Sequence, residues 1–185
     1  MAKIGLNSFR YSELTEANDG TPTYAGATQC GKAVSCSVSI TNNSATLYAD
    51  DTVAESDTSF SSGTVTLGVD NLDLATQANL LGHTYSDSVI TRSTDDVAPY
   101  VGMGRIVTLM VNGAYKYKVE FLYKVKFSEP NQDNTTKGEN VEFGTTELEG
   151  TILALANGKW SVAKTFDSKS DALTYLESLM ANPSV

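Results

Sequence analysis

The sequence predicts a mainly β protein, an antiparallel β sandwich or barrel with one or two flanking α-helices. Three observations predict this fold class. Ser and Thr make up about a fifth of the 185 residues, and with Val, Ile and Tyr they favour strands over helices. Several segments alternate between apolar and polar residues, which is the period of a strand with one buried face. The segments also lack the regular strand–helix alternation that builds a parallel sheet.

The first residues of the chain show no periodic pattern of apolar side chains. Residues 1–31 combine turn chemistry with scattered aromatic residues, so we expect an N-terminal arm. Residues 33–41 then alternate cleanly and predict a strand. We expect its apolar side chains to face the core: Val34, Cys36, Val38 and Ile40. Its other face is small, polar and uncharged: Ser35, Ser37, Ser39 and Thr41.

The least regular segment of this half is 42–62. A turn signal comes first, residues 45–49 suit a short returning strand, and no period follows before Gly63. Because the segment is longer than an ordinary connection, we expect a long acidic loop at 42–62. The acids of this loop are Asp50, Asp51, Glu55 and Asp57.

A strand and a helix are expected next. Residues 64–69 resume the alternation. Asp70 or Asn71 is the expected helix cap, and Gly82 ends the helix. The polar residues 83–99 are predicted to be a loop.

The second half is predicted to be a series of strands. Residues 104–111 are apolar on both faces, which is typical of a central strand. Asn112-Gly113 is a strong hairpin signal. Residues 114–127 alternate, with aromatic and Val side chains on one face. The other face carries Glu120 and is interrupted by Leu122, but its remaining residues are basic: Lys116, Lys118, Lys124 and Lys126.

The chain is expected to close with further strands and a second helix. The strands lie within 141–155 and 159–166. Ser168 and Asp171 form the acidic version of a capping box, which predicts a C-terminal helix at 168–182. We see neither an internal repeat nor a domain break, so 1–185 is predicted to be one domain.

The distribution of charge narrows the classes of function that the sequence allows. The net charge is −9, and no Lys or Arg lies between Lys32 and Arg92. Proteins that grip phosphates or anionic membranes need clustered bases, so both classes are excluded as first interpretations. An acidic, base-free stretch repels nucleic acid instead. The N-terminus turns polar too soon for a signal peptide, and no segment suits a spanning helix.

Residues for catalysis or metal binding are scarce. The single histidine, His83, is expected to be structural or solvated. Cys30 and Cys36 are expected to be reduced small hydrophobes. Gly102-x-Gly104 does not complete a dinucleotide fingerprint, and the acidic loop lacks EF-hand spacing. We therefore expect no catalytic site, no cofactor and no bound metal.

A series of short segments within residues 60–182 carries a family resemblance when the segments are taken in order. They are residues 75–83, 100–104, 123–127, 136–139, 141–143, 149–152 and 158–160. Together they resemble the major tail protein, or tail tube protein, of long, non-contractile-tailed bacteriophages of Gram-positive hosts. Residues 50–62 match nothing in this pattern.

The resemblance implies a structural virion protein without catalysis. In that family, six copies form a ring whose strands join into a continuous inner β barrel. Rings stack into a tube around the tape-measure protein, between the tail terminator and the distal tail protein. Phage DNA then passes the lumen without sequence-specific binding. The resemblance also implies assembly in the host cytoplasm, and this chain is expected to lack the Ig-like domain that some members add after the final helix.

Three surfaces become candidates on this interpretation. The polar face of Ser35, Ser37, Ser39 and Thr41 is assigned to the lumen, because it lies in the base-free half. The acidic loop at 42–62 is expected to contact the next ring. The lysine face either meets acids of a neighbouring subunit or is a solvated outer face.

Two other classes remain open. One is a β-sandwich binding or decoration module of a virion. The other is a different ring-forming tail component, such as the tail terminator or the inner tube of a contractile machine.

Overall fold

A computed structural model describes residues 2–49, 52–131 and 145–181, with the side chains of 45–57 left out. Its described part is mainly β, as predicted: a nine-stranded antiparallel sheet, a two-stranded ribbon and two helices. The strands are β1 (Ala2–Glu16), β2 (Pro22–Tyr24), β3 (Thr28–Gln29), β4 (Ala33–Ala49), β5 (Thr52–Val69), β6 (Thr84–Ser86), β7 (Val89–Thr91), β8 (Val101–Val111), β9 (Ala114–Phe127), β10 (Thr146–Leu153) and β11 (Ser161–Phe166). The helices are α1 (Leu74–Leu81) and α2 (Lys169–Ala181).

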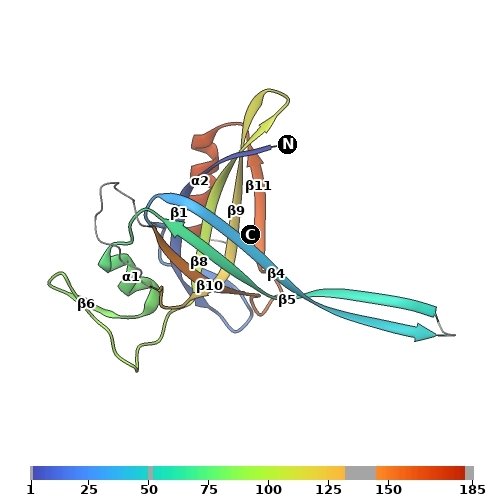
Figure 1. The fold of residues 1–185 in the computed structure, drawn as a ribbon, viewed down its shortest axis with the longest axis horizontal. Coiled ribbons are helices and arrows are strands. Elements are labelled where there is room, and N and C mark those ends of the chain that lie inside the picture. Colours follow the sequence, from blue (N-terminus) through green and yellow to red (C-terminus); the bar gives the residue numbers. More distant parts are fainter. Residues whose placement is uncertain (1, 50–51, 132–144, 182–185) are drawn as a thin grey trace, which may run out of the picture.

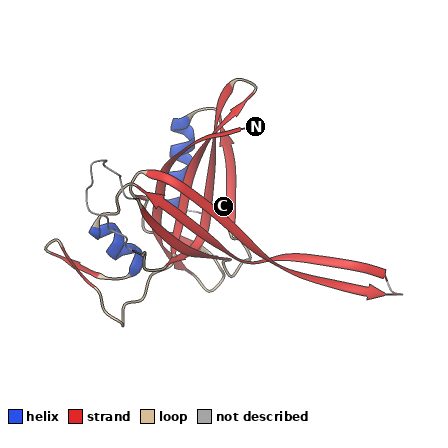
Figure 2. Cartoon of the chain, in the orientation of Figure 1, coloured by secondary structure: helices blue, strands red, loops and turns tan. Residues whose placement is uncertain are grey.

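The large sheet has the strand order β2-β1-β8-β9-β10-β5-β4. β11 pairs with β9 and β3 pairs with β1 outside this path. The described strands form an open sheet and not a closed barrel. The sheet curls, so that β4, β5 and β10 cross in front of β1, β8 and β9 (Figure 1). Helices lie at the left and at the back of this view (Figure 2).

The first correction concerns the N-terminus. Residues 1–31 were predicted to be an irregular arm, but β1 is a long strand that pairs along most of β8. The register shifts between Lys3 and Gly5 and again between Asn7 and Arg10, where Ser8 has a positive φ of 56°. Each shift moves the apolar pattern by one residue, so the period of two is lost in the sequence although the strand is present.

The second correction concerns the predicted loop at 42–62, whose described residues, 42–49 and 52–62, belong to strands. β4 and β5 continue as paired strands from Asn42 opposite Phe60 to Ala49 opposite Thr52. The resulting hairpin projects far beyond the body of the sheet (Figure 1). Neither face of a hairpin that projects from the body packs against a core. Its sequence therefore lacks the alternation of apolar and polar residues that identifies a strand with one buried face. The predicted loop at 83–99 also contains a hairpin, β6–β7.

The third correction concerns β9. Val101 pairs with Val125 but Met103 pairs with Leu122, so β9 holds one extra residue between these pairs. This bulge turns the strand over. Phe121 and Tyr123 therefore pack on one face of the sheet, whereas Val125 and Phe127 pack on the other.

Two cores result, one on each face of the β8–β9 centre. The first is enclosed by the curled sheet and α1, and is formed by residues such as Phe9, Leu67, Leu80 and Ile152. The second lies under α2, where Ile106 and Phe121 pack against Leu176. A Cβ at Gly104 would collide with Leu176, so the glycine lets α2 approach the sheet closely.

The helices follow their end signals with one change. Asp73, and neither Asp70 nor Asn71, caps α1 and accepts a hydrogen bond from the Thr76 amide at 3.3 Å. Gly82 ends α1 in the left-handed conformation, as expected. The predicted helix at 168–182 is confirmed over Lys169–Ala181. Asn112 and Gly113 both have positive φ, as a two-residue hairpin requires.

Candidate functional site

The polar face predicted on β4 is present and continues across the neighbouring strands. Ser35, Ser37, Ser39 and Thr41 are all exposed. Their partners on β5 are Gly68, Thr66, Thr64 and Ser62. A Cβ on Gly68 would collide with the Ser35 hydroxyl, so glycine keeps this surface flat. Paired residues share a face in an antiparallel sheet, and the serines and threonines therefore form one surface.

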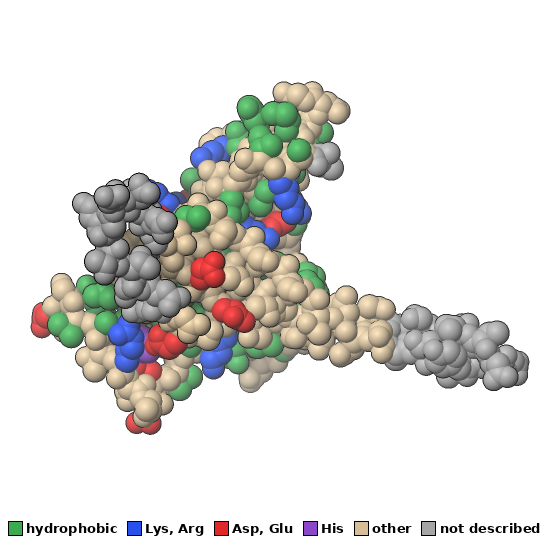
Figure 3. Space-filling model, in the orientation of Figure 1, with side chains coloured by type: hydrophobic (Ala, Val, Ile, Leu, Met, Phe, Trp, Pro, Cys, Tyr) green, Lys and Arg blue, Asp and Glu red, His purple; other side chains and the backbone are tan. Residues whose placement is uncertain are grey.

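The charge of this face changes along the strand order. On β10 the in-register residues are Glu147, Glu149 and Thr151. On β9 the next residues are Lys126 and Lys124. Figure 3 looks onto this side of β4, β5 and β10, where few side chains are hydrophobic and isolated acidic side chains are visible. The face is thus neutral on β4 and β5, acidic on β10 and basic on β9.

The apolar side of β4 differs in part from the prediction. Cys36 and Val38 pack against the first core, as expected. Val34 is 53% exposed and Ile40 is also exposed. Val34 is the extra residue at a register shift between Ala33 and Ser35, and Ile40 lies where the hairpin begins to leave the body. Neither position is covered by the curled sheet.

β4 is the last strand in the order, and its outer edge has no partner within the described chain. It is 17 residues long and contains neither a charged residue nor a proline. Proteins usually protect such edges with lysines, prolines or short strands, because an open edge templates pairing with another chain. β4 is therefore the clearest surface for strand pairing with a partner.

Two of the four acids that were predicted to contact the next ring lie among the described residues. Asp50 and Asp51 lie outside the described residues. Glu55 pairs with Leu47 and Asp57 with Ala45, in the projecting part of the hairpin. Glu55 and Asp57 therefore lie in a paired strand and not in the predicted loop. Their contact with the next ring stays a prediction.

The four lysines do not form one face. The β9 bulge separates Lys116 and Lys118 from Lys124 and Lys126, and the two pairs lie on opposite sides of the sheet. Most are also engaged within the chain. Lys116 pairs with Asp167, Lys118 lies 2.7 Å from Glu120, and Lys124 lies 2.6 Å from Glu16. Lys126 lies 5.4 Å from the centre of the Tyr100 ring.

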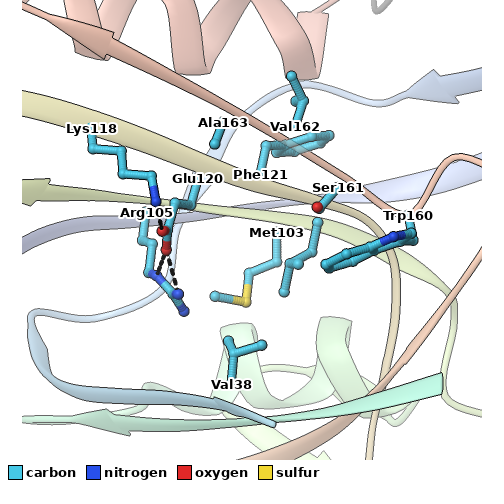
Figure 4. A pocket seen from close by; sticks show the side chains of 11 residues that line it. Val38, Met103, Arg105, Lys118, Glu120, Phe121, Trp160, Ser161, Val162 and Ala163 are labelled. Atoms are coloured by element: carbon cyan, nitrogen blue, oxygen red, sulfur yellow. Dashed lines mark hydrogen bonds and ion pairs between the residues drawn. The ribbon is translucent and has the colours of Figure 1, made fainter. Parts of the chain in front are cut away.

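A charged cluster that the sequence analysis missed lies beside a pocket of about 310 Å³. Arg105 of β8 pairs with Glu120 of β9, and Arg105 also reaches the sulfur of Cys36. Figure 4 shows Arg105 and Glu120 on one side of the pocket and Trp160 on the other. Arg105 and Glu120 are directly opposite each other in the β8–β9 register. This register runs without a shift from the Asn112-Gly113 turn to Met103, so the predicted hairpin would have revealed the pair.

Glu120 is held as a carboxylate. Burial alone would raise its pKa, but the hydrogen bonds and charges of Lys118 and Arg105 outweigh burial and lower the pKa. Its contribution to stability is thus present above the unfolded-state pKa, about 4.3, and is lost as the pH falls through the lower folded-state pKa.

We expect Glu120→Gln to lower the free energy of unfolding by about 1–3 kcal/mol at pH 7, because it leaves the Arg105 guanidinium without its charged partner. Urea denaturation from pH 7 to pH 3 measures this. The difference between the variant and the unchanged protein should shrink toward pH 3. A difference that stays constant with pH would show that the carboxylate charge is not what stabilises the cluster. Glu147→Gln, on an exposed carboxylate without a described partner, is the matched control.

The side chain of His83 is buried between two carboxylates and is therefore not solvated. Its Nδ1 lies 2.7 Å from Asp96, and its Nε2 contacts Glu129. The hydrogen bond from His83 lowers the pKa of Asp96, as does one from the Ser93 amide. This contact ties the end of α1 to the segments on either side of β8 and β9. Cys30 and Cys36 are free, and burial raises the pKa of Cys30 to about 12.

In the described part of the chain, no three His, Cys, Asp or Glu side chains gather closely enough to hold a metal ion. None of the described helices has the length and apolar character needed to cross a membrane. No family model matches the chain, and the search of curated proteins found no match. The fold and its surfaces therefore carry the functional proposal.

Proposed function

We propose that this protein is the major tail protein of a long, non-contractile-tailed bacteriophage of a Gram-positive host. Six copies form a ring, and rings stack into the tail tube around the tape-measure protein. The protein is structural, without catalysis or a cofactor, and it acts in the virion after assembly in the host cytoplasm. The tube joins the tail terminator and the distal tail protein, and DNA passes through it during ejection.

The observation that carries this proposal is the free edge of β4. A 17-residue, uncharged edge strand invites pairing with another copy of the chain. A sheet that is open in one copy then closes into a barrel with its neighbours, in the sandwich arrangement of the tail tube type. Such a ring uses a different surface on each side of the subunit, because its contacts are head-to-tail.

The polar face of β4 and β5 supports the lumen assignment. Its serines and threonines hold no charge that attracts phosphate, and the neighbouring Glu147 and Glu149 repel it. The two lysines at the far side of the face, on β9, are drawn toward Glu16 and Tyr100. The β4–β5 hairpin projects beyond the body of the sheet, and we assign it to the contact with the next ring.

Assembly of the purified protein tests the proposal. Negative-stain microscopy and sedimentation velocity over a range of concentrations should show hexameric rings and, at high concentration, tubes. A protein that remains monomeric at every concentration and binds a ligand would instead be a binding or decoration module. Rings that never stack would favour another ring-forming component, such as a terminator.

The lumen assignment gives a separate prediction. Ser37→Lys with Ser39→Lys should leave tube formation intact and slow DNA ejection, since each added charge is repeated around every ring and along the tube. Ser37→Thr with Ser39→Thr is the matched control and should eject DNA normally. The measurement is the rate of DNA release from phage carrying each variant. Normal ejection from the double-lysine phage would place this face away from the DNA.

A further inference from the structure

One end of the molecule exposes hydrophobic side chains at the turn between β8 and β9. Tyr115 is 57% exposed there, and Met110, its partner across the turn, is also exposed. Ile4 of the adjoining β1 is exposed beside them. Figure 3 shows hydrophobic side chains gathered at this upper end. Apolar groups that cluster on one exposed end are typical of a contact surface.

Lysines outnumber acids in the segments that carry and adjoin this apolar group. The segments that meet at this end are 2–5, 108–118 and 166–170, since β1 and β9 flank β8 and Phe166 pairs with Tyr117. Their charged residues are Lys3, Lys116, Lys118, Lys169 and a single acid, Asp167. Lys3 and Lys169 are exposed and have no described ion-pair partner. We call this surface, with Ile4, Met110 and Tyr115, the basic end.

The opposite end carries the β6–β7 ribbon. A two-stranded ribbon is at best marginally stable by itself in water, and five of the six residues of these strands are exposed. They include Tyr85 and Val89, and the nearby Val97 is 72% exposed. Contact with a neighbouring molecule would cover these exposed side chains.

Acids predominate on this ribbon. Residues 84–97 hold Asp87, Asp95 and Asp96 against the single base Arg92. His83 engages Asp96, which leaves Asp87 at the ribbon turn and Asp95 in the following segment exposed. We call this surface, with Tyr85, Val89 and Val97, the acidic end.

We propose that the acidic end of one copy binds the basic end of a second copy. The two ends lie far apart in the molecule, at the lower left and the top of Figure 1. The acidic end and the basic end of one copy therefore cannot contact each other. Both ends pair exposed apolar groups with charge, and the charges are opposite, as complementary surfaces require. A head-to-tail assembly needs two different matching surfaces of this kind. This inference rests on the proposed self-assembly and specifies the surfaces that it uses.

Charge exchange tests the contact. The acidic-end variant combines Asp87→Asn, which suits the positive φ of the turn, with Asp95→Lys. The basic-end variant combines Lys3→Glu with Lys169→Glu. A third variant carries all four substitutions, so its two ends are again opposite in charge. Glu147→Lys, on the face assigned to the lumen, is the control for a change of charge elsewhere.

Sedimentation velocity at low salt gives the concentration at which half of the protein is assembled. We expect this concentration to rise about tenfold in each double variant, which corresponds to about 1.4 kcal/mol. It should return to within about threefold of the unchanged protein in the four-substitution variant, a range of under 0.7 kcal/mol. Circular dichroism confirms that each variant is folded. The control should assemble as the unchanged protein does.

Two results overturn the contact while leaving the tube proposal standing: double variants that assemble normally, or a four-substitution variant no better than the double variants. An unchanged protein that stays monomeric at every concentration overturns both proposals. The difference in outcome separates failure of these surfaces from failure of self-assembly.

Discussion

Replacing residues 44–58 with an Asn-Gly turn is expected to abolish tube formation and to leave the body folded. Asn43 and Ser59 are direct partners in the β4–β5 register, so a two-residue turn can join them without a change of pairing. The contact nearest to the cut that ties the hairpin to the body is the stack of Phe60 on Trp160, with ring centres 4.7 Å apart, and it is kept. Electron microscopy measures tube length, and thermal unfolding checks the body.

The matched control keeps the length of the hairpin and removes charge. Glu55→Gln with Asp57→Asn leaves the pairing with Leu47 and Ala45 unchanged. We expect this variant to form tubes. Tubes of normal length from the shortened protein would show that the hairpin is not the element that joins rings. Loss of tubes in the control as well would assign the contact to the two acids.

Phe121→Ala should cost about 3–5 kcal/mol of the free energy of unfolding, the usual range for removing a buried aromatic ring. Phe121 is fully buried on the α2 side of the sheet. Its ring makes edge-to-face contacts with Tyr24 and Tyr123, at 5.5 and 5.4 Å between ring centres. Gly102 and Gly104 leave the space that it fills, since a Cβ at either would press on the ring.

Urea denaturation at a concentration where the protein is monomeric measures this loss. Phe121→Leu is the control, and it should cost less because it fills part of the space. A loss below about 1 kcal/mol for the alanine variant would mean that this second core contributes little to stability.

In β9, an alternating sequence pattern continues across a bulge that reverses which residues face which core. Residues 114–127 alternate almost without interruption, so they predict one aromatic face and one basic face. In the structure Leu122 belongs to the first core, and the bulge next to it exchanges the faces. Leu122, the residue that interrupted the lysine row, was the only local sign of that exchange. Sequence alone does not distinguish a bulge from a tolerated apolar residue.

Local signals in the sequence determined the parts of this protein that depend on local chemistry. The Asn112-Gly113 turn, the end of α1 at Gly82, the second helix and the polar face of Ser35 to Thr41 all follow from residue types and spacing. Each of these features is decided within a few residues, by backbone conformation or by one buried face.

Only the tertiary structure decided which strands lie side by side. The order of the strands in turn decides which residues form the candidate surfaces. The bulges in β1 and β9 depend on the partner strand, so a one-residue shift moves side chains to the other face with no local sign. The β4–β5 hairpin pairs outside the body, where no core imposes a pattern. The open edge of β4 also follows from strand order, which is set by long-range pairing.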